Sequence, residues 1–330
     1  MKPPRTSRPQ QQGMALIMVM GAVALIAFVA ARFSQRIDDL RLQTSALRAL
    51  ADQQLQARNA LATTLYYAST RPTGPAGFGP PQTPQLRADG RLYRLPEGGE
   101  VRVQDQRGLL PLNATDRPTM ALVLRALGVP ERDTDAYFDV LEDYIDTDSL
   151  KRLNGAEAPE YEQAGLPPPR NDWLLTVREL SRMPRWRESP QVVAAMERWA
   201  SPGRRPVLNP NTAPMDLLAA WWPAARPEQL DLLRGLRESA PFLNGQQAQR
   251  ATGLPLDRDD LVFHVGAQLR ITVSAQGAPR ALQYNVTLVP GGRDAPWLIS
   301  DIQAVPRAEP RDAPDRAEPF PMAVQAARKP

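Results

Sequence analysis

The stretch Gln12-Gly13-Met14-Ala15-Leu16-Ile17 joins a short basic leader to a long apolar run. The leader carries a lysine and two arginines, and the eighteen residues 14–31 contain no charged side chain. A helix rises about 1.5 Å per residue, so a helix of this length nearly crosses the roughly 30 Å hydrocarbon layer of a membrane. The sequence therefore predicts one transmembrane span at residues 14–31.

The order of leader and span predicts how the chain is oriented and processed. Basic residues before the span predict a cytoplasmic N-terminus and an exported main domain. An ordinary secretory signal is cleaved after its apolar segment, near small residues such as those at 27–31. Gly13 favours cleavage before the apolar segment, because a glycine offers a protease an unhindered peptide bond. The alternative is a plain membrane anchor that is not cleaved.

Residues 1–13 resemble the leader of a prepilin. The resemblance implies cleavage between Gly13 and Met14 by prepilin peptidase, followed by N-methylation of Met14. Most pilins and pseudopilins carry a glutamate at the fifth mature position, and this chain has Met18 there. In those families the glutamate pairs with the N-terminal amine of the subunit ahead, which offsets the cost of charges in an apolar core. Met18 therefore fits a tip position, where no subunit lies ahead.

Composition excludes several function classes. The 330 residues are 42% hydrophobic, and their 40 basic and 36 acidic side chains are interspersed. Such a distribution is typical of a solvated surface, so we expect no nucleic-acid binding. The chain contains no cysteine, which excludes disulfides and thiolate metal sites. Its single histidine, His264, lies in a strand-like run and no Gly-x-Ser-x-Gly turn occurs, so we expect no enzymatic activity.

Apolar periodicity divides the chain into a long helix, a sheet and an insertion. The helical pattern continues to residue 67, and its exported half is amphipathic and requires a partner surface. Alternating residues on both sides of Glu97-Gly98-Gly99 predict a hairpin. The predicted segments are the leader 1–13, the helix 14–67, first strands 68–112, a helical insertion 113–261, remaining strands 262–304, and a disordered proline-rich tail 305–330. The fold class is therefore α+β, with a long helix on a small antiparallel sheet that a large α-helical subdomain interrupts.

Four motifs occur in an order typical of one family. They are Asp105-Gln106-Arg107-Gly108 with Leu112-Asn113-Ala114, then Asp143-Tyr144-Ile145-Asp146-Thr147-Asp148 with Gly155-Ala156-Glu157 and Tyr161, then Arg178-Glu179-Leu180, then Leu208-Asn209-Pro210-Asn211-Thr212-Ala213. In these motifs the chain resembles the minor pseudopilin K family of type II secretion. The resemblance implies a pseudopilin fold, with the chain at the pseudopilus tip beside the minor pseudopilins I and J.

The same resemblance implies further partners and a location. The partners are other pseudopilins, prepilin peptidase and the inner-membrane secretion platform, and the task is protein secretion across the outer membrane. The chain would be a single-pass inner-membrane protein with a periplasmic main domain. Two alternatives stay open: a single-pass membrane-anchored periplasmic adaptor, and a K-like minor pilin of a related type IV pilus system.

Four acidic residues form a candidate calcium site. Asp143 and Asp146 lie three residues apart on one helix face, and Asp148 and Glu157 follow in a turn-rich segment. Converging carboxylates repel one another unless a cation lies between them, and oxygen ligands suit calcium. The residues after Asp146 do not follow the EF-hand pattern. Members of the resembled family carry calcium in this insertion, which makes a calcium site of another type the functional interpretation.

Two departures from the family pattern bear on this site. Tyr144 stands where the family usually has tryptophan, and Ala158 stands where an acidic residue commonly follows the glutamate. The loss of one carboxylate would weaken a site. The structural alternative is a helix end with solvated acids that pair with Lys151 and Arg152.

The last motif resembles the entry to a helix-hairpin-helix unit. Asn211 or Thr212 is expected to cap a helix that has Pro214 in its first turn. The glycine-rich turn that contacts DNA phosphates is missing after it, so a structural helix pair is favoured. Asn209 and Asn211 are then expected to tie the loop together through backbone hydrogen bonds.

Overall fold

The computed structural model describes residues 11–81, 83–307 and 317–322, with side chains from Leu16 onward. Most of the predicted leader therefore lies outside the described residues. The chain forms two compact units, Met1–Leu55 and Gln56–Pro330. Helix α1 (Gln11–Thr70) contributes to both units and extends three residues beyond each end of the predicted helix 14–67.

The first unit contains the apolar segment of α1. Among the described residues, this is the one helix long and apolar enough to cross a membrane, with a mean hydropathy of 2.4 in its most apolar window. Its apolar side chains are exposed, including Met18 at 69%. Farther along the helix, Leu47 and Leu50 are 67% and 55% exposed. This part of the helix therefore presents leucines that have no partner within the described residues.

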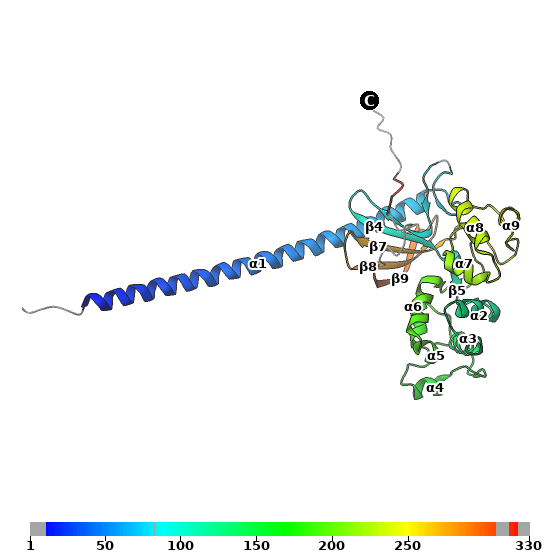
Figure 1. Cartoon of the computed structure of the whole chain (residues 1–330), viewed down its shortest axis with the longest axis horizontal. Helices are drawn as coiled ribbons and strands as arrows, with labels where there is room; N and C mark the ends of the chain where they lie inside the picture. The colour runs from blue at the N-terminus through cyan, green and yellow to red at the C-terminus, as the bar shows by residue number, and fades with distance from the viewer. Residues whose placement is uncertain (1–10, 82, 308–316, 323–330) are drawn as a thin grey trace, which may run out of the picture. The chain divides into compact units, whose positions relative to one another are not determined.

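A six-stranded sheet organises the second unit (Figure 1). Its strand order is β10-β3-β4-β7-β8-β9. The strands are β3 (Asp89–Arg94), β4 (Gly99–Asp105), β7 (Gln268–Ala275), β8 (Arg280–Leu288), β9 (Trp297–Pro306) and β10 (Glu318–Pro319), and a separate pair comprises β1 (Gly77–Phe78) and β2 (Leu86–Arg87). Neighbouring strands from β3 to β9 are antiparallel, as predicted, but β10 runs parallel to β3. The predicted hairpin is confirmed, because Leu95 N–H donates to the Gly99 carbonyl at 2.8 Å in the turn between β3 and β4.

The end of α1 packs on this sheet. Ala60, Leu65 and Ala68 are buried in one apolar core with strand residues such as Val101 and Val273. A Cβ at Gly99 would lie 2.8 Å from the Gln56 carbonyl oxygen and 2.9 Å from the Cβ of Ala60. Position 99 must therefore be glycine for the helix to approach the sheet this closely.

The insertion between β4 and β7 is predominantly helical and has its own apolar core. Trp186, Leu141 and Tyr161 are fully buried in that core. It contains η1 (Gln106–Gly108), α2 (Arg117–Ala126), α3 (Glu131–Ile145), α4 (Ala158–Gln163), η2 (Val177–Arg182), α5 (Pro184–Arg187), α6 (Pro190–Trp199), α7 (Met215–Trp221), α8 (Pro227–Ser239) and α9 (Gly245–Thr252). Two short parallel strands, β5 (Leu110–Pro111) and β6 (Ala200–Ser201), join its start to its middle. The insertion thus begins slightly before the predicted residue 113.

Two sequence predictions about the strands need correction. The strand predicted from residue 262 begins only at Gln268, and His264 lies in an exposed bend before it. The tail predicted to be disordered from residue 305 contains the end of β9, and residues 317–322 return to the sheet as β10 with Phe320 buried. Prolines in this segment suggested disorder, but an edge strand tolerates proline because half of its backbone groups need no partner. Residues 308–316 and 323–330 of that predicted tail lie outside the described residues.

Candidate metal centre

Most of the predicted metal ligands lie in the connection between helices α3 and α4, which we call the acid loop (residues 146–157). Helix α3 ends at Ile145, and Asp146 is its C-cap residue with an extended backbone. Helix α4 begins at Ala158, directly after Glu157. The Glu157 N–H donates to the Glu160 carboxylate at 3.0 Å, which fixes the end of the loop. Two helix ends therefore hold the acid loop in place.

The structure brings three of the four predicted ligands together. Carboxylate oxygens of Asp146, Asp148 and Glu157 all lie within 4.8 Å of one another. Asp148 is exposed, Asp146 is half-buried and Glu157 is buried. This range of exposure, from exposed Asp148 to buried Glu157, suits an ion that enters from solvent and is held at the base of a loop.

Asp143 does not join this group. Its side chain is fully buried and accepts hydrogen bonds from Arg152, at 3.1 Å from the backbone N–H and 2.8 Å from the guanidinium. A Cβ at Gly155 would lie 1.9 Å from Asp143 Oδ2. Asp143 therefore holds the acid loop against α3, and Gly155 makes that close contact possible.

The cluster contains polar atoms without partners. Among the described residues, Asp146 Oδ1 and Glu157 Oε1 are buried and accept no hydrogen bond. A buried oxygen without a donor costs about 1–3 kcal/mol, which a bound cation would remove. Burial, followed by the charges of Asp143, Asp146 and Asp148, raises the pKa of Glu157 above its ordinary value. The donor set is all oxygen, so these residues fit calcium.

The predicted pairing with local basic residues occurs only in part. Arg152 pairs with Asp143 and Asp146 and lies 3.4 Å from Glu142. Lys151 pairs with Glu160 at 2.7 Å and not with the cluster. Within the part of the chain that the structure describes, Asp148 and Glu157 have no ion-pair partner, so the acids are only partly neutralised.

Asn171 is a neighbour of the cluster that the sequence prediction missed. Its backbone has the positive φ of 52°, uncommon for a residue other than glycine, and its N–H donates to the Tyr144 carbonyl at 3.0 Å. Its amide nitrogen donates to the Asp148 carbonyl at 3.1 Å, while Oδ1 is buried without a donor in the described structure. It lies 23 residues from Asp148, and no short-range spacing could have indicated it.

Two of the family motifs form a different arrangement, which we call the signature knot: Asp105, Asn209 and Thr212. The Asp105 carboxylate is fully buried and accepts from Asn209 Nδ2 and Thr212 Oγ1, both at 3.1 Å. Its other oxygen accepts the N–H groups of Arg107 and Gly266, again at 3.1 Å. Burial raises the pKa of Asp105 although these bonds oppose the shift. Every oxygen is satisfied, and the knot connects β4, the insertion and the approach to β7.

The asparagines of the last motif are structural. Asn211 accepts the Phe242 N–H and donates to the Phe242 carbonyl, both at 2.9 Å, and Asn211 N–H donates to Asn209 Oδ1 at 3.1 Å. The predicted loop is confirmed. The predicted cap is wrong, because Pro214 is the N-cap of α7 and no side chain caps that helix. Asn211 instead joins two loops through backbone groups.

The Arg178-Glu179-Leu180 motif supports the region beside the acid loop. Buried Glu179 accepts the Tyr144 hydroxyl at 3.0 Å and the N–H groups of Leu175 and Thr176 at 2.9 and 3.0 Å. Burial, together with the neighbouring Glu179 charge, raises the pKa of Tyr144 to about 12. Tyr144 thus provides a hydroxyl donor at this position.

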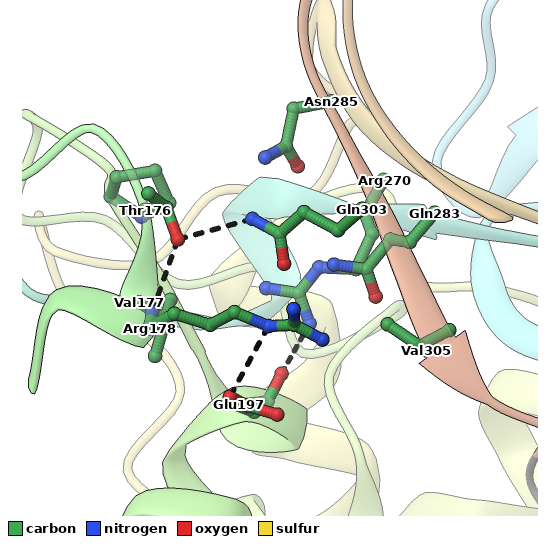
Figure 2. A pocket seen from close by; sticks show the side chains of 10 residues that line it. Thr176, Val177, Arg178, Glu197, Arg270, Gln283, Asn285, Gln303 and Val305 are labelled. Atoms are coloured by element: carbon green, nitrogen blue, oxygen red, sulfur yellow. Dashed lines mark hydrogen bonds and ion pairs between the residues drawn. The ribbon is translucent and has the colours of Figure 1, made fainter. Parts of the chain in front are cut away.

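A small polar cavity lies where the sheet meets the insertion (Figure 2). Arg270 of β7 is buried there and donates to the backbone carbonyls of Glu197 and Ala200, while its Nε has no partner in the described structure. Figure 2 shows Arg178 beside it, in an ion pair with Glu197 at 3.5 Å. The cavity of about 30 Å³ holds one or two water molecules, which would solvate Arg270. It is too small for an organic ligand.

The predicted processing residues lie in α1. Gly13 and Met14 fall within its helical range, but their side chains lie outside what the structure describes. Met18 is exposed on the same helix. Cleavage, methylation and the tip position therefore stay predictions.

Two comparisons with known proteins found similar proteins, and a third found none. Residues 103–201 match the family model described as type II secretion system (T2SS), protein K. A chain in the crystal structure of the GspK-GspI-GspJ complex from the enterotoxigenic Escherichia coli type 2 secretion system is similar over 82% of this chain and 99% of that chain, at 17% identity and a TM-score of 0.45. No curated protein sequence matches this chain. The matched segment 103–201 contains η1, the acid loop and the Glu179 motif.

Proposed function

We propose that this chain, whose residues 103–201 match the type II secretion protein K family model, is a minor pseudopilin at the tip of the pseudopilus. The observation that carries the proposal is the protein K segment on the same chain as one apolar N-terminal helix. It is a single-pass protein of the inner membrane with a periplasmic main domain. Its role is non-enzymatic: it assembles with pseudopilins I and J and supports secretion across the outer membrane.

Processing is part of the proposal. Prepilin peptidase removes residues 1–13, and Met14 becomes the methylated N-terminus. The experiment is the intact mass and N-terminal sequence of the membrane-expressed chain, with and without prepilin peptidase. We expect a new start at Met14 that carries one methyl group. A chain that still begins at Met1 in the presence of the peptidase would favour a plain anchored adaptor.

The exposed leucines of α1 are the proposed contact with pseudopilins I and J. Leu50 is 55% exposed, whereas Leu61 is partly buried against the sheet core, so only Leu50 tests a partner contact without disturbing the fold. Burial of one leucine contributes about 1.5–3 kcal/mol. We expect Leu50→Arg to abolish co-purification with I and J. Ser45→Arg is the control, since Ser45 is exposed on the opposite side of the helix. Equal recovery of both variants in the complex would refute this interface.

Calcium at the acid loop is the second part of the proposed function. Asp146, Asp148 and Glu157 would hold the ion, which would supply the positive charge that their two partnerless oxygens lack. The ion would tie the end of α3 to the start of α4 and so stiffen the insertion. This role is structural, because the ion would join two helix ends.

A further inference from the structure

The described C-terminal residues, 317–322, lie along the edge of the sheet. Glu318 pairs with Tyr93 and Pro319 with Arg94, in a parallel register. The Phe320 N–H donates to the Arg94 carbonyl at 3.0 Å. Strand β10 is only two residues long, so its backbone alone holds this segment weakly.

A single aromatic side chain anchors the segment. Phe320 is 5% exposed and packs edge-on against Tyr67 of α1 at 5.5 Å and Tyr93 of β3 at 6.2 Å between ring centroids. Such aromatic pairs contribute beyond the area that they bury. The neighbouring Met322 is 48% exposed, so Phe320 is the one large buried side chain of the segment.

The walls of the Phe320 pocket are fixed by other parts of the fold. The Tyr93 hydroxyl accepts the Arg87 N–H at 2.9 Å and donates to the Gln85 carbonyl at 3.4 Å. Tyr67 lies in the last turns of α1, beside the buried residues Leu65 and Ala68. None of these contacts involves residues 317–322.

The guanidinium of Arg91 lies beside the pocket and binds an acidic side chain. Arg91 donates to Glu318 at 2.8 Å. The same guanidinium is held by Asp89 at 2.8 Å and by Glu238 of α8 at 2.7 Å. Asp89 and Glu238 therefore fix the orientation of the Arg91 guanidinium. Its remaining N–H groups can donate to a residue that lies on the edge of β3.

We propose that the edge of β3 is a peptide-binding groove for extended segments of the form acidic-Pro-aromatic, and that residues 317–322 are its resident ligand. The edge backbone of β3 pairs with the ligand backbone, Arg91 binds the acidic side chain, and the pocket of Tyr67 and Tyr93 binds the aromatic ring. The prolines that flank Phe320 keep the ligand extended and donate no hydrogen bond that could extend the sheet further. The occupied groove leaves no free edge at β3 for another chain to pair with.

The chain supplies its own control sequence. Arg316-Ala317-Glu318-Pro319 repeats the sequence Arg307-Ala308-Glu309-Pro310, but the next residue is Phe320 in one copy and Arg311 in the other. A peptide of residues 316–322 contains both the acidic and the aromatic determinant. A peptide of residues 307–313 contains the acidic determinant alone.

The test uses fluorescent peptides and the detergent-solubilised chain. A chain truncated after Asp315 has an empty groove, and we expect it to bind the 316–322 peptide in a saturable manner. The full chain should bind it at least tenfold more weakly, because the tethered segment competes at a high effective concentration. The 307–313 peptide and a 316–322 peptide with Phe320→Ala should bind at least tenfold more weakly to the truncated chain.

A second variant protects the test against misfolding of the truncated chain. Phe320→Ala in the full chain removes the anchor and keeps every other residue, and it should also admit the 316–322 peptide. Equal binding of the two peptides would overturn the proposal, as would absence of binding to both variants when circular dichroism shows that they are folded. If both variants unfold, residues 317–322 are an integral part of the core and the proposal is wrong.

Discussion

The signature knot and the acid loop both place carboxylates in the interior, but they treat those carboxylates in opposite ways. At the knot, four donors at 3.1 Å surround Asp105. At the acid loop, Asp146 Oδ1 and Glu157 Oε1 have no donor within the described structure. A buried oxygen is costly unless it is paired, so a satisfied carboxylate holds the fold together and an unsatisfied one is a candidate cation ligand. The comparison separates a structural motif from a candidate binding site.

The largest expected effect concerns the knot. Asp105→Ala leaves four donors without an acceptor, and we expect the free energy of unfolding to fall by about 4 kcal/mol. Chemical denaturation measures it. Asp231→Ala is the control, because Asp231 forms only an exposed pair with Arg234 and should change stability by less than about 0.5 kcal/mol. A loss below about 1 kcal/mol at Asp105 would show that the knot is not a structural centre.

A third carboxylate sharpens the comparison because arginines satisfy it. Burial opposes the shift, but the hydrogen bond and charge of Arg91, with the charge of Arg87, lower the pKa of Asp89. A lowered native pKa gives stability that is present above the unfolded value of about 3.9 and is lost as the pH falls through the native value. Asp89→Asn should therefore cost about 2–3 kcal/mol at pH 7. The difference from the unmodified chain should shrink below about pH 4, and a constant difference from pH 7 to pH 3 would contradict this account.

A substitution at Gly155 should distort the acid loop without removing a predicted calcium ligand. Gly155→Ala places a Cβ 1.9 Å from Asp143 Oδ2, which must move, and we expect a loss of about 1–2 kcal/mol together with weaker calcium binding. Gly235→Ala is the matched control, because no atom lies within 4 Å of the added Cβ and alanine favours the α8 helix. Thermal unfolding with and without calcium measures both. Normal calcium affinity in Gly155→Ala would show that Asp143 does not position the loop.

Glu157→Gln is expected to change stability least and calcium affinity most. Glu157→Gln removes a carboxylate whose raised pKa shows that its charge is already disfavoured, so without calcium stability should change by less than about 1 kcal/mol. Calcium affinity should fall by about tenfold or more, since one anionic ligand is lost. Glu162→Gln, at an exposed position on α4, should leave the affinity unchanged. Equal affinities in the two variants would place the ion elsewhere.

The sequence predicted the elements with strong local patterns. Continuous hydropathy predicted α1, and the Glu97-Gly98-Gly99 turn between alternating residues predicted the hairpin. Local spacing also placed Asp146 and Asp148 correctly in one acidic cluster. Contacts that depend on distant residues could not be predicted in this way. Asn171 approaches the acid loop across 23 residues, and Asp105 meets Thr212 across 107 residues. Phe320 belongs to a segment whose prolines indicated disorder, yet it packs against Tyr67, which is distant in the sequence.

The central claim is that the acid loop binds a cation, whereas the signature knot needs none. The measurement is a calorimetric titration of calcium into the detergent-solubilised full chain after treatment with a chelator, alongside Glu157→Gln and Asp231→Ala. We predict saturable heat and a raised melting temperature for the unmodified chain and for Asp231→Ala, since an ion that binds only the folded state must stabilise it. For Glu157→Gln we predict a calcium affinity lower by about tenfold or more and a smaller rise in melting temperature at the same calcium concentration. No heat and no change in melting temperature for the unmodified chain would contradict the claim.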